Sequence, residues 1–166
     1  MLFACIGMDN WGRIKGGLTS PGNTKQIKKV KYSADLAEFL GILFGDGNSY
    51  VKKAYKVGVY AIRIVGDSRY DEEYFVNYVK PLGEHLFGIC GKISYSKTRN
   101  AVILSFYSRE MVYALEKLEF PPGNKINNKI TIPSWIRNKK LFLKQFIRGL
   151  LDTDGSIFRM SNKDFG

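Results

Sequence analysis

Hydrophobic residues recur along the chain with two different periods, and the changes of period define the elements that we expect. Residues 34–45 are apolar on nearly every side, which is typical of a short helix buried at the centre of a domain, and Ser33 is a suitable N-cap. Residues 49–65 change to alternation, which predicts a β-hairpin with a basic tip near its middle. Its second strand would place Tyr60, Ile62 and Ile64 on one face and Val59, Ala61 and Arg63 on the other.

Helical spacing returns over residues 69–87, where Pro81 is expected to kink or shorten the helix because proline has no backbone N–H. A second hairpin is expected from 92–97 and 101–107, followed by a helix over 108–118. The strands alternate polar and apolar residues. We therefore expect an α+β fold, with an antiparallel sheet, helices on one face and an open, polar second face.

Charge is the most informative feature of the composition. Lysine and arginine total 26 against 15 acids, which gives a formal net charge of +11. Residues 48–66 and 121–144 contain bases and no acid, whereas 67–87 are net acidic. Such an excess favours a polyanionic partner, above all nucleic acid, although a merely basic protein is the plain alternative.

Other classes of protein are disfavoured. Cys5 and Cys90 have neither the spacing nor the histidines of a zinc site, so we expect reduced, buried thiols in a cytoplasmic protein. The lone His85 is expected to be structural. No run approaches about 18 apolar residues, so no membrane-spanning helix and no membrane partner are predicted.

One short pattern occurs twice, as FLGILFGDG at 39–47 and IRGLLDTDG at 147–155. Each is an apolar helix that ends in Asp-Gly, and Asp46 and Asp154 stand 108 residues apart. A carboxylate at a helix C-terminus is unfavourable by roughly 0.3–1 kcal/mol unless a positive charge is near. A divalent cation would supply that charge, and magnesium suits a site of oxygen ligands.

Small residues four apart predict how the two helices meet. Gly41 and Gly45 lie on one face of the first helix, and Gly149 and Thr153 lie on one face of the second. If the helices pack along these faces, their C-terminal ends lie side by side and the two aspartates converge on shared metal ions. Gly47 and Gly155 fit the left-handed position that commonly ends a helix.

The repeated pattern resembles the LAGLIDADG motif of homing endonucleases, and the intervening helix–hairpin–helix–hairpin–helix order resembles one αββαββα half-domain of that family. The resemblance implies a metal-dependent endonuclease that cleaves duplex DNA, with Asp46 and Asp154 as catalytic metal ligands and intron homing as its setting. Asp152 is the acid at the sixth position of its motif, where the first copy has Phe44, and is therefore only a supporting candidate.

The same resemblance implies that the sheet and its hairpin tips contact DNA. The candidate residues are Lys52, Lys53, Tyr55, Lys56, Arg63, Lys92, Ser94, Ser96, Lys97, Arg99 and Asn100. An ordinary solvated strand face is the alternative for any one of them. Family members also use a basic or amide residue near the cleaved phosphates, which no motif places here.

The chain departs from the two-motif pattern after Asp154, where we expect only the start of a second half-domain. The expected organisation is a basic arm at 1–32, a half-domain at 33–138, and the second motif helix with a truncated second half at 139–166. A fragment, an inactive remnant, or a subunit completed by a homodimer or by a second chain are the alternatives. A DNA- or RNA-binding module, such as a helper of intron RNA splicing, is the alternative function.

Overall fold

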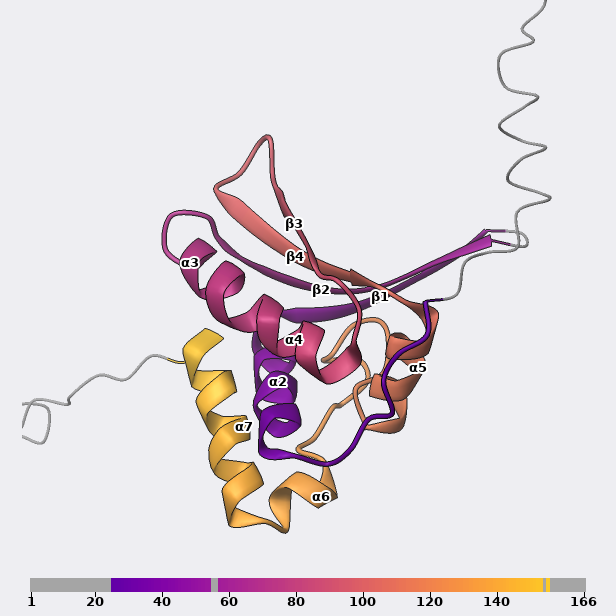
Figure 1. Cartoon of the computed structure of the whole chain (residues 1–166), viewed down its shortest axis with the longest axis vertical. Coiled ribbons are helices and arrows are strands. Elements are labelled where there is room, and N and C mark those ends of the chain that lie inside the picture. Colours follow the sequence, from indigo (N-terminus) through magenta and orange to yellow (C-terminus); the bar gives the residue numbers. More distant parts are fainter. Residues whose placement is uncertain (1–24, 55–56, 154, 156–166) are drawn as a thin grey trace, which may run out of the picture.

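The computed structural model describes residues 25–54, 57–153 and 155. Helices and strands follow one another in the predicted order, and Figure 1 shows the sheet lying over a layer of helices. The elements are α2 (Ala34–Gly45), β1 (Gly47–Ala54), β2 (Val57–Asp67), α3 (Glu72–Tyr74), the π-helix η2 (Phe75–Val79), α4 (Lys80–Phe87), β3 (Lys92–Tyr95), β4 (Ala101–Tyr107), α5 (Arg109–Lys117), α6 (Ser134–Arg137) and α7 (Lys140–Thr153). The α+β expectation is therefore confirmed.

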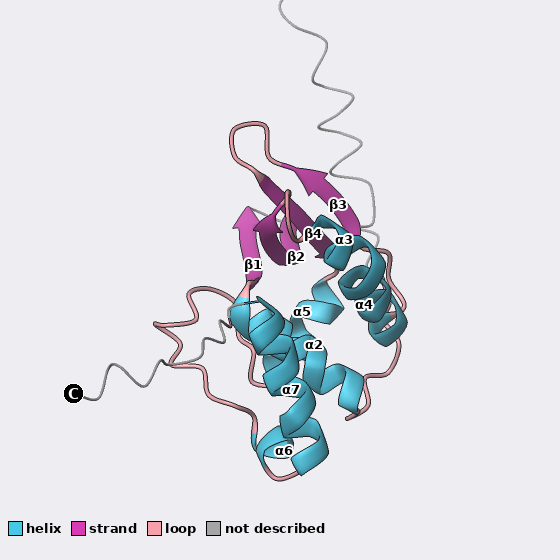
Figure 2. Cartoon of the chain, turned by 90° about the vertical axis from the view of Figure 1, so that its left-hand side faces the viewer, coloured by secondary structure: helices cyan, strands magenta, loops and turns pink. Residues whose placement is uncertain are grey.

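The strands form an antiparallel sheet in the order β1-β2-β4-β3. Ile62 and Ile64 of β2 and Leu104 of β4 are fully buried against the helices, as the alternation predicts. In Figure 2 the described helices lie on one side of the sheet only, so no described element covers its other face. That face is not purely polar, because Val59 and Val65 are each 43% exposed on it.

Helix α2 lies at the centre of the helical layer. Its residues from Leu36 to Leu43 are buried, which agrees with an apolar pattern that leaves no solvated stripe. The Ser33 hydroxyl accepts a hydrogen bond of 3.1 Å from the Leu36 N–H, so the predicted N-cap is confirmed. Phe39 packs at 6.1 Å between ring centroids on Phe106 of β4 and joins this helix to the sheet.

The helix around Pro81 shows that one of the two expected effects of proline, a shortened helix, does not occur. Proline does not shorten it; α3, η2 and α4 continue one another, and the π-helical turn lies immediately before Pro81. In that turn the Lys80 N–H donates to the Phe75 carbonyl, five residues back. A wider turn accommodates the missing N–H of proline without ending the helix. Cys90 differs from the sequence expectation, because it is exposed in the turn between α4 and β3 rather than buried.

Residues 25–33 precede α2 as an extended segment attached to the helical layer. The Lys28 N–H donates to the Phe87 carbonyl at 2.9 Å, and the Ile27 N–H donates to the Glu110 carboxylate at 3.0 Å. This is the described part of the predicted basic arm; the rest of 1–32 lies outside the described residues. Among the described residues, no helix combines the length and apolar character needed to cross a membrane.

Candidate metal centre and nucleic-acid interface

Helices α2 and α7 cross in close backbone contact through one glycine from each repeated motif. A Cβ atom at Gly41 would overlap the Phe146 carbonyl oxygen, and one at Gly149 would overlap the Glu38 carbonyl oxygen. Figures 1 and 2 show both helices running from the lower end of the molecule toward the sheet. Their C-terminal ends therefore lie on the same side, as the small-residue spacing predicts for these two glycines.

The other two predicted packing residues are placed differently. Gly45 is buried at the end of α2, and its carbonyl oxygen accepts a hydrogen bond from Lys125 Nζ. Thr153 is half-buried, and its hydroxyl donates within its own helix, at 3.2 Å from the carbonyl oxygens of both Gly149 and Leu150. The Thr153 hydroxyl therefore bonds back to the last turn of its own helix.

Asp46 caps the C-terminal end of α2, half-buried and directly before β1. Its N–H donates to the Ile42 carbonyl at 3.1 Å, and its own carbonyl accepts from the Val65 N–H at 3.3 Å. The backbone of Asp46 is thus fixed both to the helix and to β2. The carboxylate is consequently attached to a rigid position between the helical layer and the sheet, as a metal ligand requires.

The prediction of a left-handed glycine after Asp46 is wrong. Among the described residues the glycines with positive φ are Gly88 and Gly123, and Gly47 has no such conformation. Glycine is needed there because a Cβ at Gly47 would overlap the backbone of Leu43 as the chain turns into β1. A Cβ at Gly155 would overlap the Cα and the carbonyl oxygen of Leu151 in the same way. Both motif ends therefore need glycine because a Cβ would overlap the preceding helical turn, and not because the backbone has a positive φ.

Lys125, from the connector between α5 and α6, lies at the same helix end. Its ammonium donates to the Phe44 carbonyl at 2.9 Å and also to the Gly45 carbonyl. A cation at this position stabilises the negative end of the helix dipole, which is also the position of Asp46. A carboxylate at a helix C-terminus is stable only with a positive charge nearby, and Lys125 supplies part of that charge beside Asp46.

The second half of the proposed metal site is only partly described. Asp154 lies outside the described residues, and within them no group of three or more His, Cys, Asp or Glu residues is arranged to hold a metal ion. Asp152, the supporting candidate, is exposed and pairs with Arg148 at 3.8 Å. Of the two predicted metal ligands, Asp46 is the one that the structure describes. Its carboxylate offers the type of oxygen ligand that magnesium takes.

A polar cluster lies beside the helix crossing. Glu38 is only 4% exposed; it accepts a 2.5 Å hydrogen bond from the Tyr78 hydroxyl and lies 3.6 Å from Arg148 Nε of α7. Burial, followed by this hydrogen bond, raises the pKa of Tyr78 to about 12, so the phenol stays protonated and donating. Burial also raises the pKa of the stacked Tyr74. The cluster ties η2 to both motif helices.

Polar side chains cross the open face of the sheet in one row. Asn48, Arg63, Ser105 and Lys92 are in register on successive strands β1, β2, β4 and β3. The Arg63 guanidinium lies 4.6 Å from the centre of the Tyr50 ring, which holds it over the sheet. Lys52 and Ser94 are exposed on the same face. The predicted residues of the strands are therefore brought together on one surface.

The hairpin tips are described unequally. Lys97, Arg99 and Asn100 are exposed at the β3–β4 tip, where the Ser96 hydroxyl accepts hydrogen bonds from the N–H groups of Thr98 and Arg99 at 3.3 and 3.2 Å. Ser96 is thus used to shape the turn. At the other tip, Tyr55 and Lys56 and the side chain of Lys53 lie outside the described residues.

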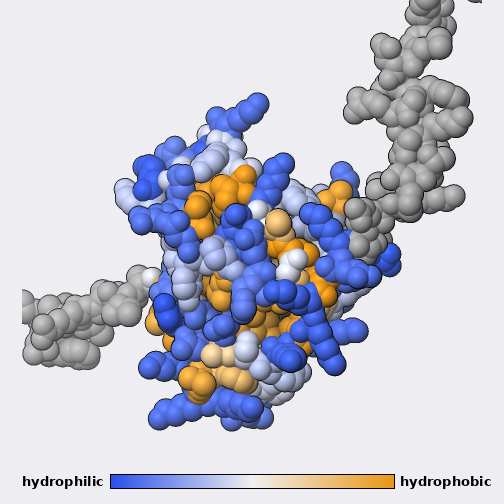
Figure 3. Space-filling model, viewed as in Figure 1, coloured by the Kyte–Doolittle hydropathy of each residue, from blue (hydrophilic) through white to orange (hydrophobic). Residues whose placement is uncertain are grey.

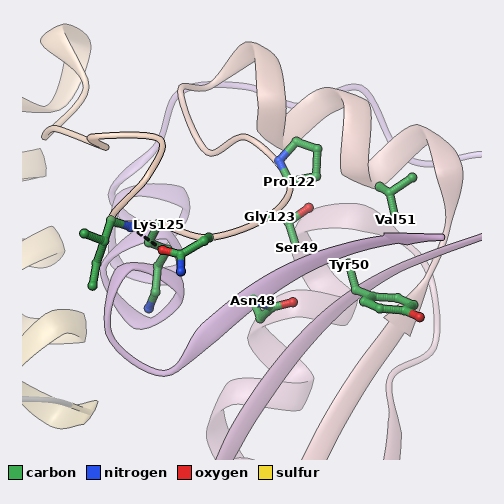
Figure 4. A pocket seen from close by; sticks show the side chains of 9 residues that line it. Asn48, Ser49, Tyr50, Val51, Pro122, Gly123 and Lys125 are labelled. Carbon is green, nitrogen blue, oxygen red and sulfur yellow. Dashed lines mark hydrogen bonds between the residues drawn. The ribbon is translucent and has the colours of Figure 1, made fainter.

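A groove of about 720 Å³ runs beside the edge strand β1, between it and the connector (Figure 4). The Gly123 N–H donates to the Ser49 carbonyl at 3.0 Å and fixes the connector to the strand. Asn48 and Tyr50 line the groove from the strand, and Lys125 lines it from the connector. The groove therefore links the polar row on the sheet with the helix end that carries Asp46.

Sequence reasoning missed Lys125, Asn48 and Tyr50. Lys125 belongs to the acid-free segment 121–144, but no local spacing indicates that it reaches a helix end 80 residues earlier in the chain. The alternation of β1 could have identified Asn48 and Tyr50, since both share the face of Lys52.

Comparison with solved structures places the fold. The chain resembles the crystal structure of I-DmoI in complex with DNA and Mn, with a TM-score of 0.52, 22% sequence identity, and coverage of 72% of this chain and 61% of that chain. It also resembles mesophilic variants of the homing endonuclease I-DmoI, with a TM-score of 0.53 and 22% identity. That match covers 74% of this chain and 62% of the other chain. The chain therefore has the fold of homing endonucleases and spans less than two thirds of these structures.

Sequence comparison adds a short match. The chain is 33% identical over 66 residues to a tRNA-splicing ligase RtcB of Methanopyrus kandleri, a match that covers 39% of this chain and 7% of that protein. No family model matches the chain.

Proposed function

We propose that this protein is a DNA endonuclease of the homing type. In this proposal duplex DNA lies on the open face of the sheet, and divalent cations at the ends of α2 and α7 support hydrolysis of its phosphodiester bonds. The observation that carries the proposal is the close, same-direction crossing of two motif helices, which presents Asp46 between the helical layer and the sheet. The fold shared with I-DmoI, itself solved with DNA and Mn, supports the same reading.

Asp46 would hold the cation, together with Asp154 at the same place of the second motif. A bound magnesium ion would activate a water molecule and stabilise negative charge on the phosphate. The residues of the chain supply position and charge. The backbone hydrogen bonds of Asp46 fix its carboxylate, and the polar row with Arg63 and Lys92 orients the duplex.

We assign Lys125 as the basic residue near the cleaved phosphates, which no sequence motif could identify. Its ammonium lies at the carbonyl oxygens of Phe44 and Gly45, directly before Asp46, and it lines the groove that reaches the sheet. A fixed cation there would stabilise the charge that develops on a phosphate during cleavage.

Cleavage of a randomised duplex library tests the proposed function. We expect cut products that require a divalent cation and that disappear when the cation is chelated. Binding of duplex DNA without cutting at any metal concentration would show a non-cleaving DNA-binding module. Preference for intron RNA over duplex DNA would show a splicing helper instead.

The sheet face gives a separate prediction about affinity. Lys92→Ala should weaken duplex binding severalfold for all sequences and lower the dependence of log affinity on log salt by about 0.9, the value for one lost phosphate contact. Fluorescence anisotropy over a range of salt concentrations measures both quantities. Lys117→Ala is the matched control, because Lys117 is exposed on α5 in the helical layer. An equal loss in the two variants would contradict the assignment of the sheet.

A further inference from the structure

A second basic surface lies on the helical layer, where two segments without acids meet. Residues 25–33 and 129–147 contain only bases among their charged residues. They are joined by Tyr32 and Trp135, whose rings stack with 4.5 Å between centroids and 26° between planes. We call this region the Tyr32 surface; it consists of Lys29, Lys31, Tyr32, Trp135, Arg137, Lys139 and Lys140.

The Tyr32 surface is held in place. The backbone of 25–33 is anchored where the Lys28 N–H donates to the Phe87 carbonyl at 2.9 Å, and the Ser108 hydroxyl donates to the Lys25 carbonyl at 3.1 Å. Tyr32 is nevertheless 62% exposed. A ligand that stacks on this ring would therefore meet a surface whose backbone is already ordered.

The cations of the Tyr32 surface are available to a ligand. Lys29, Lys31, Arg137 and Lys140 are exposed, and no ion pair among the described residues includes them. Lys139 lies 4.9 Å from the centre of the Phe142 ring. The acid nearest in sequence is the exposed Asp35, in the first turn of α2. The net charge of the Tyr32 surface is thus strongly positive.

This surface is remote from the open sheet face. Figures 1 and 2 both place α6 and the start of α7 at the end of the molecule farthest from the sheet. In Figure 3 hydrophilic side chains surround a smaller hydrophobic patch at that end. A duplex that lies on the sheet would therefore not cover the Tyr32 surface.

We propose that the Tyr32 surface binds single-stranded nucleic acid, with its phosphates at the cations and an unpaired base stacked on Tyr32. Exposed aromatic rings among cations are the combination used to bind single strands, because every base offers a ring face. A duplex keeps its bases stacked internally and would offer no unpaired base to the exposed part of the Tyr32 ring, which already stacks on Trp135. This second site would bind a single strand whether or not the protein cleaves DNA.

The test uses the full chain and a fluorescent oligouridylate of about twelve nucleotides, a length within the range that single-strand-binding domains cover. Tyr32→Ala should weaken its binding roughly tenfold, as expected for the loss of one stacked base, while Tyr32→Phe should retain it. The Lys31→Glu, Arg137→Glu double variant should weaken binding at least as much and leave duplex affinity unchanged. It keeps the test decisive if Tyr32→Ala fails to fold.

Competition separates this site from the sheet. Saturating duplex DNA should leave the oligouridylate bound, whereas Lys92→Ala should weaken the duplex alone. Displacement of the oligouridylate by duplex, or equal affinity of wild type and the double variant, would overturn the proposal. So would binding to vesicles that contain phosphatidylserine without binding to the oligonucleotide, since that result would identify an anionic membrane as the partner.

Discussion

Asp46→Asn is expected to abolish metal-dependent DNA cleavage while duplex binding persists. The substitution keeps the size of the side chain and removes the charged oxygen donor at the end of α2. Loss of a residue that merely orients a metal ligand costs about 10–100-fold, so loss of a direct ligand should cost about a hundredfold or more. Single-turnover cleavage at a saturating concentration of metal ion measures the effect.

Stability distinguishes this role from a structural one. Because a carboxylate at a helix C-terminus is unfavourable by roughly 0.3–1 kcal/mol, Asp46→Asn should leave the free energy of unfolding within about 1 kcal/mol of wild type. Asp35→Asn is the matched control, since Asp35 is exposed in the first turn of the same helix. It should cut normally. Full cleavage by Asp46→Asn would remove the proposed metal site.

Gly41→Ala has the second large expected effect, and its sign is diagnostic. In an exposed helix this change stabilises by roughly 1 kcal/mol through helix propensity. Here the new methyl group would overlap the Phe146 carbonyl oxygen, which is backbone and cannot turn aside. Overpacking of this kind typically costs about 1–3 kcal/mol. We expect net destabilisation and loss of cleavage, as the helix ends move apart.

Gly149→Ala should behave in the same way, because its methyl group would overlap the Glu38 carbonyl oxygen from the other side of the crossing. Urea denaturation of both variants provides the measurement. Stabilisation by either alanine would mean that the two helices are not in backbone contact in solution, and the convergence of their ends would then have no basis.

The sequence was sufficient for features that depend on local periodicity. The all-round apolar pattern of 34–45 places α2 at the centre, and alternation assigns Ile62 and Ile64 to the core and Arg63 to the open face. Both inferences need only the geometry of one element, because a helix or strand fixes which residues share a face.

The crossing of α2 and α7 at Gly41 and Gly149 was predicted from small-residue spacing, but other meetings of distant segments were not predictable. Lys125 reaches the end of α2 through a connector whose path no pattern encodes. Gly47 was expected in a left-handed conformation because helices often end so, but its role is set by the close passage of the chain over Leu43. The π-helical turn before Pro81 accommodates the missing N–H of proline, a local solution that helical spacing alone does not reveal.

The separation of the two sheet faces has a consequence for evolution. Lys92 and Ser94 point away from the core, while their strand neighbour Ile93 packs against it. If the open face contacts DNA as proposed, substitutions at the outward positions would change what it recognises at little cost to folding. Such mutations could then accumulate without compensating changes elsewhere, so a lineage could follow a drifting recognition sequence while its scaffold stayed constant.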